Sequence, residues 1–346
     1  MSEPWRLVEG APLQARNTFG VPATADLMVE VRDAAALPDL FGNAMLRDGP
    51  VLVLGSGSNL LFAGDPPGVV LALGGQGIAI VEDDGDCALV RAEAGVDWHA
   101  LVLWTLGHGL AGLENLALIP GTVGAAPIQN IGAYGVEVAE CIDVVEAFER
   151  GTREQRILAR DECAFGYRDS RFKREPERHV VTAVRFRLQR RAPPRVDYAG
   201  LAEELAAMGA EEPRPSQVAE AVCRLRRRKL PDPALTGNAG SFFKNPVVSE
   251  AAARELKLAH PGLPVFPAAS EDERKLSAAW LIDACGWKGR REGDAGISER
   301  HALVLVNHGA ASGAQLLTLA RNVAASVRER FGVALEPEPR IVGAAW

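Results

Sequence analysis

The sequence lacks any apolar run long enough to cross a bilayer, and its first residues have neither the basic segment nor the apolar core of a secretion signal. It also lacks an excess of positive charge: 38 lysines and arginines face 45 aspartates and glutamates, and the formal net charge is −7. An acidic chain has no general field for binding nucleic acid. We therefore expect a cytoplasmic protein that neither inserts into a membrane nor binds DNA or RNA.

Residue patterns that bind metals are missing as well. The five cysteines form no Cys-x-x-Cys pair and lie tens of residues apart, which is typical of reduced thiols in the cytosol. None of the six histidines lies two or four residues from another, so we expect no metal site. A Gly-x-Ser-x-Gly motif, which would indicate a serine hydrolase, is also absent.

Length and local patterns indicate more than one domain. The 346 residues are enough for two or three domains, and the Arg-Arg-Ala-Pro-Pro stretch at 190–194 is the clearest break in composition, so we place a boundary near it. Apolar runs and alternation predict strands at 27–31, 51–54, 69–73, 88–92, 141–148, 180–188 and 301–307. Apolar residues at helical spacing predict helices at about 216–229, 275–285 and 313–330.

The basic run at the end of the first of these helices allows two interpretations. Residues 224–229 carry five cations, and such a run is usually a solvated helix face. Lys229, however, comes four residues after Leu225 and continues the apolar stripe. It could therefore point inward and bind a phosphate.

Glycine is the residue in excess. Of 35 glycines, residues 55–77 and 107–135 hold seven each. Glycines permit positive φ and leave no Cβ in the way, so such segments can bring backbone N–H groups close to a diphosphate. The first stretch opens with Gly55-Ser-Gly-Ser-Asn59 after a predicted strand, but it is neither the dinucleotide fingerprint nor a P-loop. A tight turn explains this motif equally well.

The second stretch, Gly112–Gly135, is too apolar for a solvent-exposed linker and too rich in glycine and proline for a helix. Packing against another group must therefore order it. A large, flat, partly apolar ligand with a polar tail fits this description. The alternative is a buried irregular connection between domains.

Phe165–Ser170 places an aromatic ring, a guanidinium and a carboxylate side by side. Arg168 could bind a substrate carboxylate or stabilise a developing enolate. From these residues alone, a surface ion pair between Arg168 and Asp169 is at least as good an interpretation.

The segment Gly237–Pro246 is predicted to be extended. Period-two alternation then puts Ser241, Phe243 and Asn245 on one face and Phe242 and Lys244 on the other. A hydroxyl and an amide on one face could meet the same ligand. An ordinary strand with an exposed serine is the simpler alternative.

Taken together, these segments closely resemble the bacterial UDP-N-acetylenolpyruvoylglucosamine reductases, flavoenzymes of peptidoglycan precursor synthesis. The resemblance covers about residues 17–343, and the matching segments occur in the family's order: Asn17–Gly20, Leu54–Asn59, Gly112–Gly135, Phe165–Ser170, Lys229–Pro233, Gly237–Pro246, Trp280–Asp283 and Leu335–Arg340. It implies an α+β fold. An FAD-binding module of the vanillyl-alcohol-oxidase (PCMH) type would span residues 1–190, in two α+β subdomains at about 1–72 and 73–190, and an α+β substrate-binding domain would span 191–346.

The resemblance also implies the activity. NADPH would reduce bound FAD, and the enolpyruvyl group of UDP-N-acetylglucosamine enolpyruvate would then be reduced to give UDP-N-acetylmuramate. The hydride would arrive at the vinyl methylene carbon, and a proton at the carbon that bears the carboxylate. The expected partners are this sugar nucleotide and NADPH, and the expected oligomeric state is a monomer.

By matching motifs, the resemblance assigns roles to individual residues. Ser241 would donate the proton, and Arg168 and Glu338 would stabilise the enolate-like intermediate. The substrate would be contacted by Tyr167, Tyr198, Lys229, Asn245 and Lys275. The cofactor would be contacted by Gly55, Ser56, Gly57, Ser58, Asn59, Pro120, Gly121, Thr122, Gly124, Gln129, Asn130, Gly132, Ala133 and Tyr134. A serine hydroxyl is a very weak acid, so it can protonate only a strongly basic enolate held beside it.

Two other functions stay open at this point. One is a PCMH-type flavin oxidase that acts on a sugar or an aldonolactone, against which the Lys229 and Ser241 motifs speak. The other is a non-catalytic UDP-sugar sensor with the same fold. The joint presence of Arg168, Ser241 and Glu338 makes a sensor the weaker interpretation.

Overall fold

The structure is a computed structural model that describes residues 3–346, and within it the chain divides into two units. Unit 1 consists of the N-terminal segment up to Ala11, Ala25–Gly57 and Pro66–Arg227, and unit 2 consists of Pro12–Thr24, Ser58–Asp65 and Arg228–Trp346. This division differs from the boundary that we placed near residue 190. Residues 191–227 belong to unit 1, and two short N-terminal segments belong to unit 2.

The first sheet of unit 1 has the strand order β1-β2-β5-β3. Its strands are β1 (Trp5–Pro12), β2 (Thr24–Val31), β3 (Val51–Leu54) and β5 (Val69–Leu73). β2 and β3 both pair in parallel with β5, and their apolar runs are buried, as is usual in parallel sheets. The short helices α1 (Leu37–Leu40) and α2 (Ala44–Asp48) pack on this sheet through Leu37, Leu40 and Leu46. Gly55 therefore follows the carboxyl end of a parallel strand.

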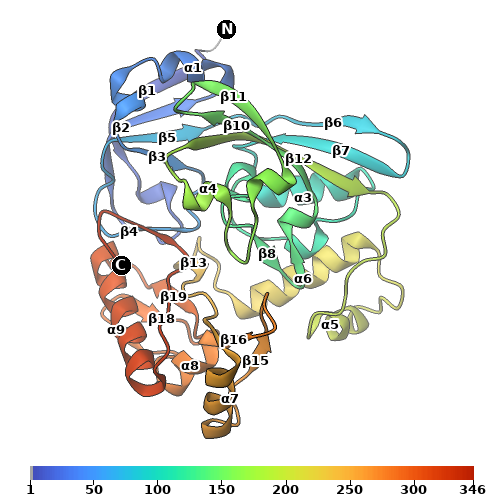
Figure 1. The fold of residues 1–346 in the computed structure, drawn as a ribbon, viewed down its shortest axis with the longest axis vertical. Helices are drawn as coiled ribbons and strands as arrows, with labels where there is room; N and C mark the ends of the chain where they lie inside the picture. The colour runs from blue at the N-terminus through green and yellow to red at the C-terminus, as the bar shows by residue number, and fades with distance from the viewer. Residues whose placement is uncertain (1–2) are drawn as a thin grey trace. The chain divides into compact units, whose positions relative to one another are not determined.

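The second sheet of unit 1 is antiparallel, with the strand order β11-β10-β12-β7-β6 (Figure 1). Its strands are β6 (Ile78–Asp83), β7 (Cys87–Glu93), β10 (Ile142–Glu149), β11 (Glu154–Ala159) and β12 (His179–Gln189). One face forms a core with α3 (Trp98–Gly107), α5 (Leu201–Ala207) and α6 (Pro215–Lys229). Leucines 201 and 205 of α5 are buried in this core, which explains why residues beyond 190 stay with unit 1.

The remaining elements of unit 1 are short. They are the helix α4 (Arg171–Arg174) and the two-stranded pair β8 (Gly132–Ala133) and β9 (Val136–Glu137). The backbone between α3 and β8 runs through single 3-10 turns instead of regular helix. Its apolar side chains Leu113, Leu116 and Val123 are nevertheless fully buried.

Unit 2 has three small sheets and three helices. One sheet has the order β13-β19-β18-β17, with β13 (Gly237–Ser241), β17 (Arg291–Glu292), β18 (Ala295–Ile297) and β19 (Val304–Asn307). The second consists of β14 (Val247–Ser249), β16 (Glu273–Leu276) and β15 (Val265–Pro267) in that order, and the third joins β4 (Leu60–Phe62) in parallel to β20 (Arg340–Val342). The helices are α7 (Glu250–Ala259), α8 (Ala278–Ala284) and α9 (Gly313–Phe331).

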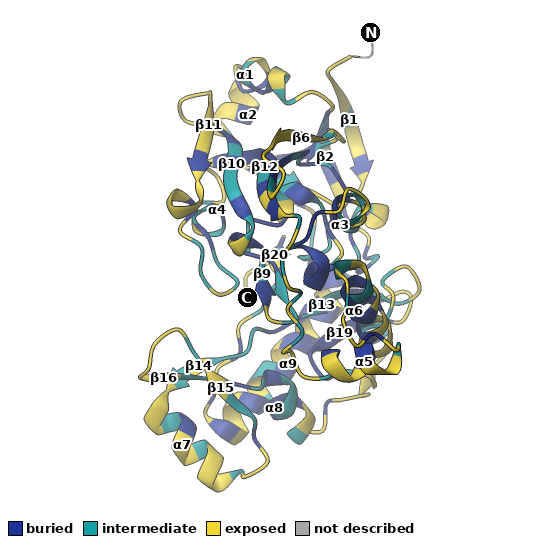
Figure 2. Cartoon of the chain, turned by 90° about the vertical axis from the view of Figure 1, so that its right-hand side faces the viewer, coloured by how far each residue is buried: buried dark blue, intermediate teal, exposed yellow. Residues whose placement is uncertain are grey.

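Burial differs sharply between these helices (Figure 2). α9 buries Leu316, Ala320 and Val323 among other residues, whereas α7 buries only Ala253 of the side chains that are described. α9 also meets β4 at close range, because a Cβ at Gly313 would lie 1.6 Å from the carbonyl oxygen of Phe62. Only glycine can occupy this position without moving one of the two elements.

Most of the predicted elements are present, and two of them begin three residues later than predicted. The helix predicted at 275–285 begins at Ala278, because Lys275 and Leu276 belong to β16 and Ser277 caps the helix. The strand predicted at 301–307 begins at Val304. All five cysteines are free thiols. Over residues 3–346, no helix combines the length and the apolar character needed to cross a membrane.

Candidate functional site

Both glycine-rich stretches reach the same part of unit 1. A Cβ at Gly55 would lie 2.6 Å from Oγ1 of Thr122, so the side chain of Thr122 packs directly against the backbone at position 55. Gly57 has φ +64° and Gly121 has φ +141°, conformations that side chains strongly disfavour. Such segments can turn several N–H groups toward one anion. The residues present therefore fit the diphosphate of the FAD implied by the sequence.

Gly124 is the tightest point of the second stretch. Its N–H donates to the carbonyl of Ala94 at 2.9 Å, and a Cβ added at Gly124 would lie 2.6 Å from the Cβ of Ala94. We expect Gly124→Ala to weaken FAD binding about tenfold or more, because overpacking costs ~1–3 kcal/mol and the segment must shift to relieve it. Fluorescence titration of the apoprotein with FAD measures the change. The matched control is Gly107→Ala at the end of α3, where a Cβ meets nothing within 4 Å; equal weakening in both variants would refute the assignment.

The backbone just before Pro120 is held in a strained conformation by two side chains. Leu118 has φ +58°, its N–H donates to Nδ1 of His99 at 3.0 Å, and its carbonyl accepts from Nε of Arg226 at 3.1 Å. Burial lowers the pKa of His99, which keeps its ring neutral and able to accept this bond. Burial also lowers the pKa of Arg226. Non-glycine residues with positive φ persist only where their surroundings hold them, and they concentrate at functional sites.

Neither His99 nor Arg226 was among the site residues predicted from the sequence. The sequence favours a solvated face for residues 224–229 and allows Lys229 to point inward. In the structure Lys229 is exposed, and Arg226 is the cation that faces the core. The signal was available, because Arg226 lies four residues after the buried Val222 and thus on the inner face of α6. No comparable pattern marks His99.

Asn130 is a buried junction within the second stretch. It has φ +46°, and its side-chain nitrogen donates to Glu137 at 2.7 Å and to the carbonyl of Gly166 at 3.0 Å, while its oxygen accepts from the N–H of Ala139 at 3.0 Å. These bonds join the segment predicted to bind the cofactor to the turn that carries Arg168. Glu137 is a third residue, after His99 and Arg226, that was not predicted from the sequence.

Arg168 lies at the tip of a tight turn. Gly166 and Asp169 exchange two backbone hydrogen bonds, of 2.9 and 3.2 Å, and Arg168 has φ +52°. Its Nη2 donates to the carbonyl of Gly132 at 2.6 Å. Asp169 forms its ion pair with Arg174. The turn thus places the Arg168 guanidinium beside the predicted cofactor segment, which favours the functional interpretation over a surface pair with Asp169.

Two tyrosines predicted to contact substrate or cofactor also meet in unit 1. The rings of Tyr134 and Tyr198 are 5.1 Å apart, edge to face. Tyr134 has φ +49°, and its carbonyl accepts from the side chain of Asn115, which also holds the carbonyl of Arg195. Asn115 therefore ties the segment around Tyr198 to the cofactor stretch.

The predicted site residues are shared between the two units. Unit 1 holds Gly55, Ser56, Gly57, Pro120, Gly121, Thr122, Gly124, Gln129, Asn130, Gly132, Ala133, Tyr134, Tyr167, Arg168 and Tyr198. Unit 2 holds Ser58, Asn59, Lys229, Ser241, Asn245, Lys275 and Glu338. The division falls inside the Gly55–Asn59 motif, between Gly57 and Ser58.

Within unit 2, Ser241 and Glu338 lie on adjacent extended segments. Ser241 ends β13, opposite Val304 of β19. The N–H of Glu338 donates to the carbonyl of Phe242 at 2.8 Å, and Phe243 forms a bridge with Pro337. The structure therefore brings together the backbones of the predicted proton donor and the predicted carboxylate.

The alternation predicted along 241–245 is wrong. Phe242 and Phe243 are both 1% exposed, and their ring centroids are 5.1 Å apart, which side chains on opposite faces could not achieve. The register slips between Asn238 and Ser241, and Gly240 has φ +70°. Beyond this irregularity the chain leaves β19 and pairs with the segment of Glu338 instead, so period two does not continue.

The residues of unit 2 that are predicted to bind substrate lie in or near its three-stranded sheet, or at the end of α6. Oδ1 of Asn245 accepts from the N–H of Ala278 at the start of α8, at 3.0 Å. Lys275 occupies the central strand β16, between Val247 and Phe266. Burial lowers the pKa of His301, and the positive charge of nearby Lys229 lowers it further.

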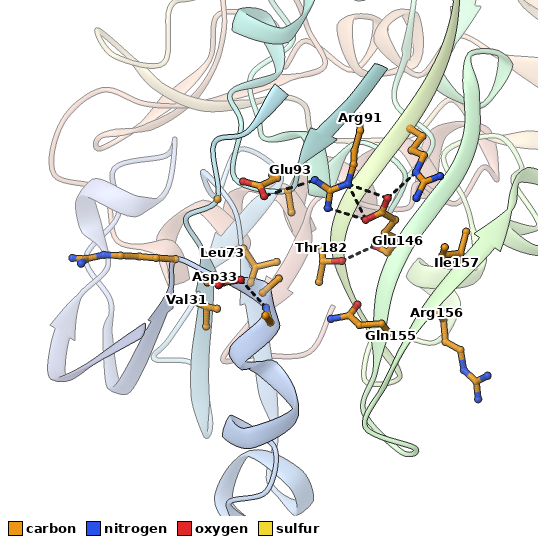
Figure 3. Close-up of a pocket in the computed structure, with 16 residues that line it drawn as sticks. Val31, Asp33, Leu73, Arg91, Glu93, Glu146, Gln155, Arg156, Ile157 and Thr182 are labelled. Carbon is orange, nitrogen blue, oxygen red and sulfur yellow. Dashed lines mark hydrogen bonds and ion pairs between the residues drawn. The ribbon is translucent and has the colours of Figure 1, made fainter. Parts of the chain in front are cut away.

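A separate cavity of about 380 Å³ lies within unit 1 between its two sheets (Figure 3). Arg91 projects into it between Glu93 and Glu146. Glu146 accepts from Nη2 of Arg91 at 2.8 Å and from Nε of Arg185 at 2.8 Å. None of the predicted site residues lines this cavity. Arg91 and Arg185 are thus paired within the cavity by Glu146, which indicates a structural role at the junction of the sheets.

We expect Glu146→Gln to lower the free energy of unfolding by about 1–3 kcal/mol, because two half-buried guanidinium groups lose their shared partner. Burial raises the pKa of Glu146, but the hydrogen bonds from Arg91 and Arg185 outweigh it and hold that pKa below its usual range. The stabilisation is therefore complete above the unfolded pKa of about 4.3 and is lost as the pH falls through the lower folded value. Urea unfolding at pH 7 and at pH 3 measures it.

The matched control is Asp48→Asn, which breaks an exposed ion pair with Arg47 and is expected to change stability by less than about 0.5 kcal/mol. An equal effect of the two substitutions at pH 7 would show that burial adds nothing to the Glu146 network.

Comparison with known proteins identifies the family. Residues 25–153 match an FAD binding domain, and residues 232–342 match the UDP-N-acetylenolpyruvoylglucosamine reductase C-terminal domain. UDP-N-acetylenolpyruvoylglucosamine reductases of Xanthomonas oryzae pv. oryzae (strain PXO99A) and Xanthomonas campestris pv. campestris (strain 8004) are each 58% identical over 342 residues, covering 99% of this chain and 98% of theirs.

A solved structure agrees. The UDP-N-acetylenolpyruvylglucosamine reductase (MurB) from Thermus caldophilus aligns over 98% of both chains, with a TM-score of 0.67 and 29% identity. These findings confirm the expected α+β fold with an FAD-binding module, and they confirm the resemblance found in the sequence. The chain belongs to the UDP-N-acetylenolpyruvoylglucosamine reductase family.

Proposed function

We propose that this protein is an FAD-dependent oxidoreductase that uses NADPH to reduce the enolpyruvyl group of UDP-N-acetylglucosamine enolpyruvate, giving UDP-N-acetylmuramate for peptidoglycan synthesis. The observation that carries the proposal is 58% identity over nearly the whole chain to reductases of this name. FAD, when bound, supplies the hydride chemistry between NADPH and the substrate. The chain itself must bind the substrate, stabilise its charge and deliver a proton.

Ser241 is the proposed proton donor. Arrival of a hydride at the vinyl methylene carbon leaves a pair of electrons on the carbon that bears the carboxylate. The Ser241 hydroxyl gives its proton to that carbon, and the resulting alkoxide recovers a proton from water. A group this weakly acidic works only in a site where the basic carbon is held beside it.

Arg168 and Glu338 are the proposed stabilisers of the intermediate. A guanidinium presents a planar fork of N–H donors, which suits the two oxygens of an enolised carboxylate. The fixed turn around Arg168 supports this role, because the donor needs no reorganisation during the reaction. Glu338 is proposed to hydrogen-bond the same intermediate, and its backbone link to Phe242 supports this assignment.

Further proposals concern substrate binding and context. Lys229 and Lys275 are proposed to bind the anionic groups of the sugar nucleotide, with Tyr167, Tyr198 and Asn245 as further contacts. A net charge of −7 makes such local cations necessary. We also propose that unit 1 is the flavin module and unit 2 the substrate domain, since unit 1 holds most of the matched range 25–153 and unit 2 holds the matched range 232–342. We also propose that the protein is a monomer in the cytoplasm.

Absorbance of the flavin tests the function directly. Purified protein should be yellow, should bleach with NADPH under anaerobic conditions, and should regain its colour when the enolpyruvyl sugar nucleotide is added. A colourless protein that binds no FAD would refute the proposal. Rapid oxygen consumption with a sugar or an aldonolactone, without NADPH, would support the oxidase instead.

A further inference from the structure

Glu338 lies in an unusually stiff segment, Glu336-Pro337-Glu338-Pro339. Proline fixes its own φ and has no N–H, and it holds the preceding residue in an extended conformation. The direction in which the Glu338 side chain leaves the backbone therefore depends on how the segment as a whole is docked. The few hydrogen bonds that its backbone can form decide that docking.

Both backbone polar groups of Glu338 are occupied. Its N–H donates to the carbonyl of Phe242, the residue after Ser241, at 2.8 Å. Its carbonyl accepts from Nδ2 of Asn59 at 3.3 Å. The backbone of Asn59 is fixed in turn, because its carbonyl accepts from the N–H of Arg340 at 3.0 Å.

The Asn59 side chain thus extends an existing ladder. β4 begins directly after Asn59, and β20 begins two residues after Glu338, with Leu60 opposite Arg340 in parallel register. The hydrogen bond from the side-chain amide of Asn59 to the carbonyl of Glu338 lies next to the first residue pair of this ladder, Leu60 and Arg340. Asn59, Phe242, Glu338 and Arg340 all belong to unit 2.

We propose that Asn59 is a positioning residue for Glu338, which aligns this carboxylate with Ser241 by holding the backbone carbonyl of residue 338. This inference rests on the proposed function, in which Glu338 stabilises the intermediate that Ser241 protonates. Asn59 was expected from the resemblance to contact the cofactor. The inference gives it a different task, in the proton-transfer half of the reaction.

The first experiment separates the two half-reactions in Asn59→Ala and Asn59→Asp, the second of which keeps the size of the side chain and loses the donor. Flavin reoxidation by the enolpyruvyl sugar nucleotide should slow by roughly 10–100-fold, because misplacement of a group by about 1 Å can cost 10²-fold. Reduction by NADPH, the KM for the sugar nucleotide and the FAD content should each stay within about twofold. The matched control is Asn43→Ala, which removes an exposed asparagine cap of α2 and should change none of these quantities.

The second experiment is a double-mutant cycle with Glu338→Gln. If Asn59 acts through Glu338, adding Asn59→Ala to Glu338→Gln should slow reoxidation by less than about twofold. Equal slowing in both backgrounds, or loss of FAD from the Asn59 variants, or no slowing at all, would each overturn the inference. Failure of the wild-type protein to reoxidise with this substrate would instead refute the proposed function, so the two failures are distinguishable.

Discussion

Ser241→Ala is expected to keep its yellow colour and its reduction by NADPH, while reoxidation by the enolpyruvyl sugar nucleotide slows by roughly 10²–10⁴-fold, the range for loss of general acid catalysis. Alanine removes the proton source and leaves the backbone bonds around residues 241–243 in place. The intermediate must then take its proton from water, which is not held beside the reacting carbon. Anaerobic stopped-flow absorbance of the flavin measures both half-reactions.

Two further substitutions sharpen this test. Ser241→Cys restores a proton donor of similar size, with a pKa near 8.5 in free cysteine, and should recover part of the lost rate. Ser249→Ala removes a serine that caps α7, and should leave both half-reactions unchanged. Equal slowing of the two half-reactions in Ser241→Ala would argue against the role of proton donor.

Arg168→Lys is expected to lower the rate of the sugar-dependent half-reaction by about 10²–10³-fold, the cost of removing a donor aimed at developing negative charge. Lysine keeps the positive charge but replaces a planar fork of donors by a single ammonium group. It also loses the geometry that holds Nη2 of Arg168 2.6 Å from the carbonyl of Gly132. Single-turnover reoxidation and FAD content measure the effect.

The control is Arg174, five residues after Asp169 of the same turn. Arg174→Lys changes an arginine that pairs with Asp169 at the surface, and it should alter the reaction by no more than about twofold. If both substitutions slowed the reaction equally, stability of the turn would explain the loss. An Arg168→Lys protein with the wild-type rate would remove Arg168 from the catalytic group.

Prediction from the sequence succeeded where local signals are strong. The strands at 51–54 and 69–73 are short apolar runs, and α9 carries both a capping box at Ser312 and a glycine with positive φ at 332. Such signals act within a few residues, so the chain specifies them locally. The family resemblance extended the prediction to the site, because it rests on several motifs spread over nearly the whole chain.

Prediction failed where distant segments compete for the same residues. Lys275 reads as the start of a helix, yet pairing with β14 and β15 draws it into β16. Phe243 reads as the continuation of an alternating strand, yet pairing with Pro337 removes it from β19. The sequence places Arg226 in a solvated basic face, but its hydrogen bond to the carbonyl of Leu118 holds it against the core.

The sequence by itself determined the absence of metal-ligand spacings, the two glycine-rich segments and the motifs that carry the family resemblance, since each depends on residues close together in the chain. Only the tertiary structure decided that Gly55 meets Thr122 and that Asn59 holds Glu338, 279 residues away. The physical reason is that a hydrogen bond or a close contact between such segments depends on how the strands are paired. The conformational preferences of neighbouring residues do not determine which distant strands pair.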